Sequence, residues 1–341
     1  MRHHHCTGMK YLTVLLLAVA LPAQPPRTAA PSKDAPAEDL PAPIKVDVDV
    51  VNILASVRDK KNALVANLEK DDFTILEDGK QQTIKYFTRE TDLPLTIGLL
   101  IDVSGSQRNL IDIERNAASQ FFSKVLRKKD EAFLISFGEE SELLQDYTSS
   151  PRLLEEGLRQ LRVSSGVSGL HPGPVPTAGQ PRGTVLYDAV YLAASEKLKG
   201  EVGRKVIVLI TDGVDQGSRM TRPQAIEAAQ KSDAVIYSID YSDPSAYGFG
   251  PLNIGGGGGE GELRRMSDET GGRVYKVDRK HTLDDAFQEL QDEMRSQYAI
   301  GYTPSNDVKD GGYRKLDVRL ANKDLKAQAR KGYYAIKPDS R

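Results

Sequence analysis

The stretch LTIGLLIDVSGSQRN, residues 95–109, joins an apolar run to an abruptly polar end. The run LTIGLLI is apolar on both faces of an extended chain, which is typical of a strand that helices cover on each side. It ends at Asp102, Ser104 and Ser106. In an open α/β sheet, such strand ends lie at the carboxyl edge, where ligands bind. The stretch therefore predicts a fold and the place of a site.

Around this stretch, apolar runs alternate with amphipathic segments, which predicts a doubly wound, mostly parallel, Rossmann-like α/β sheet. KVIVLIT (205–211) and AVIYSI (234–239) are again apolar on both faces. The pattern predicts strands over 95–101, 132–137, 142–147, 205–211, 234–240 and 273–277, and helices over 107–126, 151–162, 185–199, 222–231, 260–270 and 282–296.

Two later segments reach the same predicted edge of the sheet. LITDG (209–213) places Asp212 after a strand, and RGTVLYDAV (182–190) places Thr184 at the start of a helix. Carboxylate and hydroxyl oxygens are hard ligands that suit Mg²⁺ or Mn²⁺. We therefore predict a cation site with an open position, and because most direct ligands are neutral, the ion stays electrophilic. The predicted metal ligands are Asp102, Ser104, Ser106, Thr184 and Asp212.

A simpler explanation covers part of this pattern. Serine and aspartate are favoured at helix N-caps and in turns, so Ser104 and Ser106 could cap the next helix. Capping would not also require Thr184 and Asp212 at the same edge. Two further aspartates are candidate outer residues of the site. Asp188 either orients a ligand or is simply solvated, and Asp215 is expected to belong to the loop rather than to the metal.

These residues resemble the von Willebrand factor A domains, whose metal-ion-dependent adhesion site (MIDAS) consists of Asp-x-Ser-x-Ser with a threonine and an aspartate from two later loops. All five positions match, and the resemblance covers residues 95–295. It implies a site for Mg²⁺ or Mn²⁺ to which an acidic side chain of a protein partner adds the last ligand. The flanking segments look like those of exported von Willebrand A-related proteins from acidobacteria and similar bacteria.

The segments on either side of this domain have strand patterns. IKVDVDVVNILASVRD (44–59) alternates with period 2, and DFTILEDGKQQTIKYF (72–87) predicts two strands joined by a turn at Asp78 and Gly79. QYAIGYTP, RKLDVRLA and KAQARKGYYA predict three more strands near the C-terminus. We expect the A domain, residues 94–296, to be inserted in a β-sandwich-like module built from 44–93 and 297–336, with a tail at 337–341.

The N-terminal residues predict export. Lys10 precedes an apolar run from Leu12 to Leu21, too short to span a bilayer, so residues 1–23 are expected to be a signal peptide cut after Ala20 or Ala23. An uncleaved anchor is the alternative. Residues 24–43 contain six prolines and predict an extended linker. The expected location is the periplasm, the cell surface or the exterior.

The composition limits the classes of partner and of chemistry that we expect. The formal net charge of -2 does not favour nucleic acid or an anionic membrane as a partner, so membrane contact is expected only through an uncleaved signal. The single cysteine, Cys6, lies in the predicted signal, which excludes disulfides and thiol chemistry after cleavage.

The two Gly-rich loops, 163–183 and 242–262, lack the Gly-Lys-Ser/Thr of a phosphate loop. The first could form a partner-contact surface or be a tolerated insertion, and the second is expected to be a linker. Candidate contact residues in them are His171, Tyr247 and Phe249. We expect a binding module rather than an enzyme. A metal-assisted hydrolase that uses the same cation and His171 is the alternative, and export disfavours a chelatase subunit.

Overall fold

The computed structural model of the chain describes residues 50–89, 93–164, 183–241 and 258–337. The predicted signal peptide and linker, and also His171, Tyr247 and Phe249, lie outside the described residues. Within the described residues, every helix is too short or too polar to cross a membrane.

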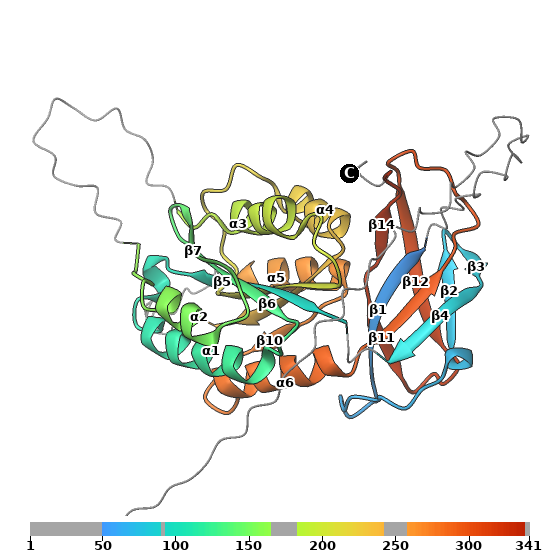
Figure 1. Cartoon of the computed structure of the whole chain (residues 1–341), viewed down its shortest axis with the longest axis horizontal. Coiled ribbons are helices and arrows are strands. Elements are labelled where there is room, and N and C mark those ends of the chain that lie inside the picture. Colours follow the sequence, from blue (N-terminus) through green and yellow to red (C-terminus); the bar gives the residue numbers. More distant parts are fainter. Residues whose placement is uncertain (1–49, 90–92, 165–182, 242–257, 338–341) are drawn as a thin grey trace, which may run out of the picture. The chain divides into compact units, whose positions relative to one another are not determined.

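A six-stranded sheet forms the centre of the A domain, and Figure 1 labels its strands β5, β6, β7 and β10. The strand order is β10-β9-β8-β5-β6-β7. All neighbours pair in parallel except β6 and β7, so the predicted doubly wound, mostly parallel sheet is confirmed. The strands are β5 (Leu95–Asp102), β6 (Glu131–Phe137), β7 (Ser141–Thr148), β8 (Arg204–Thr211), β9 (Ala234–Asp240) and β10 (Val274–Lys276).

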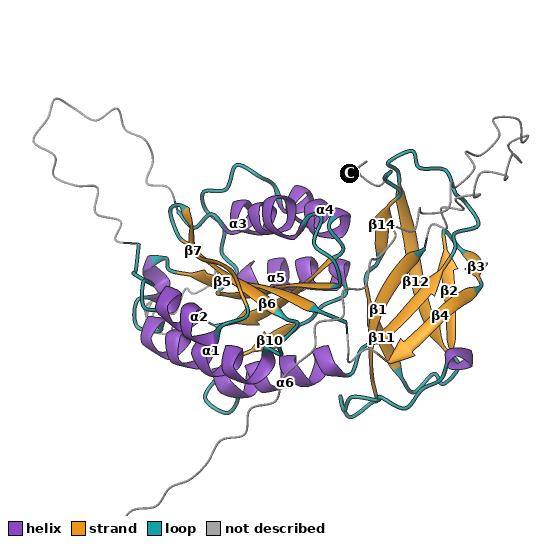
Figure 2. Cartoon of the chain, in the orientation of Figure 1, coloured by secondary structure: helices purple, strands orange, loops and turns teal. Residues whose placement is uncertain are grey.

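Helices cover both faces of this sheet (Figure 2). One face packs against α1 (Ile111–Val125), α2 (Pro151–Leu158) and α6 (Leu283–Arg295). The other face packs against α3 (Leu186–Leu192), α4 (Arg222–Lys231) and α5 (Gly258–Thr270). Because both faces are covered, every residue of β5, β8 and β9 is buried, as their apolar sequences indicate.

Several helix boundaries differ from the sequence prediction, and the helix predicted over 151–162 ends at Leu158. The helix expected from residue 107 starts later, because Gly105–Gln107 form a 3₁₀ turn. The helix expected over 185–199 is α3 followed by a π-helical segment, Ala193–Leu198. The second Gly-rich stretch was expected to be a linker as far as residue 262, but its last part is the first turn of α5.

The two flanking segments pair with each other, as the predicted fold class requires. One four-stranded sheet has the order β13-β1-β11-β4 and the other β14-β12-β2-β3. Each sheet takes strands from both flanks, and the two share one apolar core. The strands are β1 (Val51–Arg58), β2 (Phe73–Glu77), β3 (Lys80–Gln82), β4 (Ile84–Arg89), β11 (Tyr298–Tyr302), β12 (Tyr313–Leu320), β13 (Lys326–Ala329) and β14 (Gly332–Tyr334).

The predicted turn at Asp78 and Gly79 is present, and both residues have positive φ, as a two-residue hairpin turn requires. The single strand predicted between this turn and residue 87 is wrong in one respect. It divides at Thr83 into β3 and β4, which belong to different sheets. The last C-terminal run divides in the same way into β13 and β14. A chain that changes sheet keeps its period-2 alternation, so the local pattern does not show the change.

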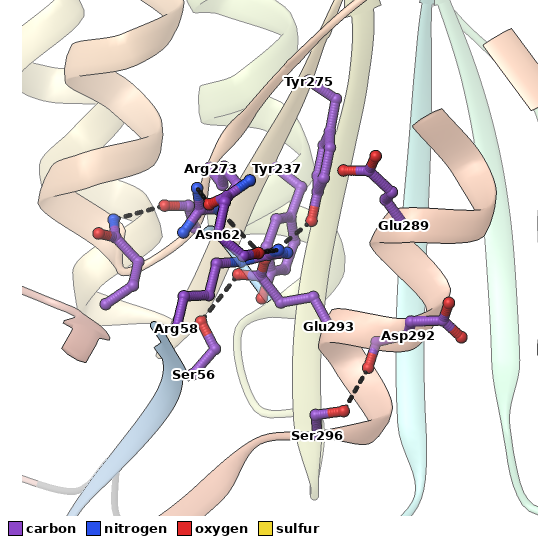
Figure 3. Close-up of polar contacts among 12 residues, drawn as sticks. Ser56, Arg58, Asn62, Tyr237, Arg273, Tyr275, Glu289, Asp292, Glu293 and Ser296 are labelled. Atoms are coloured by element: carbon purple, nitrogen blue, oxygen red, sulfur yellow. Dashed lines mark hydrogen bonds and ion pairs between the residues drawn. The ribbon is translucent and has the colours of Figure 1, made fainter. Parts of the chain in front are cut away.

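A buried polar cluster joins the flanking module to the A domain (Figure 3). Glu293 of α6 is fully buried and forms an ion pair with Arg58 of β1, with a nitrogen to oxygen distance of 2.6 Å. The same carboxylate accepts hydrogen bonds from the hydroxyls of Ser56, at 2.9 Å, and Tyr275, at 3.0 Å. The β-sandwich therefore contacts the last helix of the A domain through hydrogen-bonded charge.

Candidate metal centre

Asp102 is the last residue of β5 and is fully buried at the carboxyl edge of the sheet. Its Oδ1 accepts a hydrogen bond of 2.9 Å from the backbone N–H of Ser104. Its Oδ2 accepts one of 2.6 Å from the hydroxyl of Thr211, at the end of the neighbouring strand β8. Both oxygens are thus held in place by protein donors, one from each of two adjacent strand ends.

The two serines of the motif connect this strand end to the next one. The hydroxyls of Ser104 and Ser106 lie 3.0 Å apart. Ser106 donates a hydrogen bond of 2.8 Å to Oδ2 of Asp212. Neither serine caps a helix with its side chain, because Ser104 precedes the 3₁₀ turn without a side-chain cap bond and Ser106 lies within that turn. The capping explanation therefore does not account for the serines.

Thr184 reaches the same place from the loop before α3. The backbone carbonyl of Thr184 accepts hydrogen bonds from the N–H groups of Gln216 and Gly217, in the loop that follows Asp212. The next residue, Val185, donates its N–H to the carbonyl of Gly138 after β6. These backbone bonds place the threonine beside Asp212.

One cavity of about 280 Å³ lies over these residues. Four of the five predicted metal ligands line it, and the fifth, Asp102, lies beneath and is hydrogen-bonded to one of them. The rim adds a cation, Arg108, and an anion, Glu139. The four lining ligands are Ser104, Ser106, Thr184 and Asp212.

Asp102 and Asp240, at this edge, are destabilised in their charged form. Burial raises the pKa of Asp102 to about 6, and the charge of Asp212 adds to this, while hydrogen bonds from Thr211 and Ser104 partly oppose it. Burial likewise raises the pKa of Asp240, the last residue of β9, to about 6. A cation at this edge would favour the ionised carboxylates, so the electrostatics complement a positive ligand.

The donor chemistry fits a hard divalent cation. Two carboxylates and three hydroxyls offer only oxygen, which suits Mg²⁺ or Mn²⁺. In the part of the chain that the structure describes, there is no group of three or more His, Cys, Asp and Glu side chains able to hold a metal. Three of the five predicted ligands are Ser or Thr, and only two are Asp. The predicted site therefore does not contain three residues of the types His, Cys, Asp and Glu, and it is compatible with this finding.

Asp188 and Asp215 fix the loops around the cavity. Asp188 accepts hydrogen bonds from the backbone N–H groups of Arg219, at 2.9 Å, and Met220, at 2.7 Å. Asp215 accepts one of 2.5 Å from the hydroxyl of Ser218 and a longer one from the start of α3. Both aspartates therefore tie the loop after Asp212 to the helix that follows Thr184, which is a positioning role.

Three further residues contribute to the site without being predicted metal ligands. LITDG places Thr211 at the strand end beside Asp212, and in the structure its hydroxyl orients Asp102. Gly213 has a positive φ of 77°, and a Cβ there would collide with the carbonyl oxygen of Gly259, so the turn after Asp212 requires glycine. Asp240 ends a parallel strand, as Asp102 does, and the same rule about strand ends could have found it.

The chain was compared with known proteins. A comparison with curated proteins gave no match. Among solved structures, an aerotolerance-related membrane protein from Bacteroides fragilis NCTC 9343 is 17% identical and aligns over 59% of this chain and 98% of its own, with a TM-score of 0.42. The SpRpn10 VWA domain is 14% identical over 58% of this chain and 95% of its own, with a TM-score of 0.39.

A third solved structure is proximal thread matrix protein 1 from the mussel byssus, described as having a zinc-occupied MIDAS motif. It is 13% identical over 64% of this chain and 50% of its own, with a TM-score of 0.44. Residues 97–214 match the model of a family described as the von Willebrand factor type A domain. The matched residues run from β5 to the loop after Asp212.

Proposed function

We propose that this protein is an exported binding module. A divalent cation, Mg²⁺ or Mn²⁺, binds at the candidate metal centre and engages an acidic side chain of a protein partner. The ligands are Asp102, Ser104, Ser106, Thr184 and Asp212, and the protein acts in the periplasm, at the cell surface or outside the cell. Nucleic acid is not a partner, and the membrane is contacted only if the signal stays uncleaved.

One observation carries the proposal. Donors from three separate loops gather at one open cavity, although the two that are hydrogen-bonded across it, Ser106 and Asp212, lie 106 positions apart in the chain. Three of the five donors are neutral hydroxyls. Both oxygens of Asp102 already accept hydrogen bonds, which spreads part of its negative charge. A cation held in this way keeps positive charge toward the open side, where a carboxylate completes the coordination.

Binding is favoured over hydrolysis, because a hydrolase also needs a base positioned against the reacting water. His171 lies outside the described residues. Glu139 lines the cavity, and it is the described residue whose removal tests the alternative most directly. The mussel protein's zinc-occupied MIDAS motif adds Zn²⁺ to the cations that should be compared.

Isothermal titration of the chain from residue 24 onward tests the proposal. MgCl₂, MnCl₂ and ZnCl₂ are titrated first, and then a glutamate-containing peptide and its glutamine counterpart, with and without EDTA. We expect cation binding, and peptide binding that needs both the cation and the glutamate. Asp212→Asn should abolish both, whereas Asp317→Asn, at an exposed ion pair on β12, should change neither.

The contrary results are equally definite. Peptide binding that persists in EDTA or in Asp212→Asn would refute the proposal. Turnover of p-nitrophenyl acetate or bis-p-nitrophenyl phosphate that needs the cation, and is lost in Asp212→Asn and Glu139→Gln, would establish the hydrolase instead.

A further inference from the structure

A second cavity lies at the other end of β8 from the metal centre. It has a volume of about 450 Å³ and is lined by residues of the A domain, such as Lys205 and Val202, and of the flanking module, such as Tyr86. Lys205 is the second residue of β8, whereas Asp212 directly follows the last, so the two sites are separated by about 20 Å of strand. This cavity is therefore a separate site.

Lys205 is a buried cation in the wall of this cavity. The exposed fraction of Lys205 is only 9%. Among the described residues, its ammonium group has no hydrogen-bond or ion-pair partner within bonding distance. Burial lowers the pKa of Lys205, and the charges of Asp233 and Glu201 only partly oppose this. An ammonium group in such surroundings lacks the close anion that buried charges normally have.

The neighbouring cations are already engaged. Arg204 donates a hydrogen bond of 2.6 Å to the backbone carbonyl of Met294. Arg330 forms an ion pair with Asp233 and also bonds to the carbonyl of Asn52. Of the cations that line the cavity, Lys205 is therefore the one whose donors make no bond to the described part of the protein, so they are available to an incoming ligand.

The same cavity exposes large apolar side chains. Val202 is 73% exposed, Tyr86 is 57% exposed and Leu93 is 46% exposed, and all three line the cavity. They come from three different segments, so the apolar wall is a property of the fold rather than of one loop. A concave surface that combines apolar side chains with a few polar groups is the usual composition of a small-molecule site.

We propose that this cavity binds a small carboxylate with an apolar tail, whose carboxylate pairs with Lys205 and whose tail lies on Val202, Tyr86 and Leu93. A single available ammonium matches the single charge of a carboxylate. Glu201 and Asp233 line the same cavity and would repel a doubly charged phosphate. The proposal is independent of the metal centre.

Titration calorimetry with the full chain tests this site, with octanoate as the probe. Octanamide has the same tail without the charge, acetate has the charge without the tail, and inorganic phosphate represents the other class of anion. We expect measurable binding of octanoate, at least tenfold weaker binding of octanamide, and no binding of acetate or phosphate. EDTA should leave octanoate binding unchanged.

Variants separate the charge from the apolar wall. Lys205→Met keeps the length of the side chain and should weaken octanoate binding at least tenfold while leaving octanamide unchanged. Val202→Ser should weaken octanoate and octanamide alike, by about threefold. Lys315→Met removes an exposed lysine of β12 and should change nothing.

Three results would overturn the proposal. These are octanoate that fails to bind at millimolar concentration, octanoate that binds Lys205→Met as tightly as the natural protein, and phosphate that binds more tightly than octanoate. If Lys205→Met does not fold, amide chemical shifts of the natural protein replace it. Octanoate must then shift the amides of residues 203–206 and leave those of 212–217 in place.

Discussion

Nη2 of Arg58 lies 2.6 Å from Oε2 of Glu293, and this ion pair links the first strand of the β-sandwich to the last helix of the A domain. The carboxylate is fully buried and also accepts the hydroxyls of Ser56 and Tyr275. An inserted domain is connected to its host by two chain segments, and here the connection is reinforced by a charge that both parts bury.

Removal of the Glu293 carboxylate should lower the free energy of unfolding. Glu293→Ala leaves the guanidinium of Arg58 buried without its anion, so we expect the free energy of unfolding to fall by about 3–5 kcal/mol. Urea unfolding followed by circular dichroism measures it. Glu289→Ala is the matched control, because Glu289 lies one turn earlier on α6 and its side chain is 48% exposed. That variant should lose no more than about 1 kcal/mol. Equal losses in the two variants would show that the buried pair contributes nothing special.

Gly98 allows the ring of Phe133 to pack on the central strand. A Cβ at residue 98 would collide with that ring, so Gly98→Ala should lower the free energy of unfolding by about 1–3 kcal/mol. Phe133→Leu frees the space, and the double variant should therefore be more stable than the sum of the two single changes predicts. Gly105→Ala is the control, because a Cβ there meets no atom within 4 Å. Strictly additive losses would contradict this account.

Metal binding should depend on pH through Asp102. Its pKa of about 6 in the metal-free protein lies above the ordinary 3.8, so a proton competes with the cation below that pH. We expect Mg²⁺ affinity to be constant above about pH 7 and to fall by up to tenfold per pH unit below about pH 6. Titration calorimetry across this range measures the midpoint. Thr211→Val removes a hydrogen bond that lowers this pKa, so the midpoint should move upward. An unchanged midpoint would refute the assignment.

The raised pKa of Asp102 also affects the stability of the metal-free protein. Metal affinity should rise with pH, whereas the contribution of Asp102 to the free energy of unfolding should fall. The folded state binds the proton of Asp102 more tightly than the unfolded state does, so this group stabilises the fold at low pH. Its contribution is lost as pH rises from about 4 to about 6. In EDTA, Asp102→Asn should remove this pH dependence, and urea unfolding at both ends of the window is the measurement.

The gathering of the site residues could be predicted from sequence because it follows from local patterns and one topological rule. Asp102 and Asp212 each follow an apolar run, and parallel strands bring their carboxyl ends to one edge. Thr211 satisfies the same rule, and the rule could also have added Asp240, which ends β9. Metal binding at this edge stays a prediction, which the titration with Mg²⁺, Mn²⁺ and Zn²⁺ tests.

Other features depend on contacts that no local pattern contains. Gln82 and Ile84 continue the same alternation, so the change of sheet at Thr83 leaves no trace in the sequence. Glu293 and Glu289 are both acidic residues of one amphipathic helix, and only the packing of the β-sandwich buries the first and exposes the second. The cavity around Lys205 is lined by residues such as Tyr86 and Val202 that lie far apart in the sequence, so no local pattern predicts it.

The charge of Lys205 should reduce stability until a ligand binds. Burial disfavours the charged form of Lys205, so Lys205→Met should raise the free energy of unfolding near neutral pH. Because burial lowers the pKa of Lys205, the folded state loses its proton before the unfolded state does. The free energy of unfolding of the natural protein should therefore rise relative to that of Lys205→Met as pH rises toward about 10.5. Urea unfolding of both proteins at several pH values gives the difference, and Lys315→Met should follow the natural protein throughout.

If Lys205→Met is instead the less stable protein at neutral pH, the ammonium group has a stabilising partner, and the cavity then has no unpaired charge to offer a carboxylate.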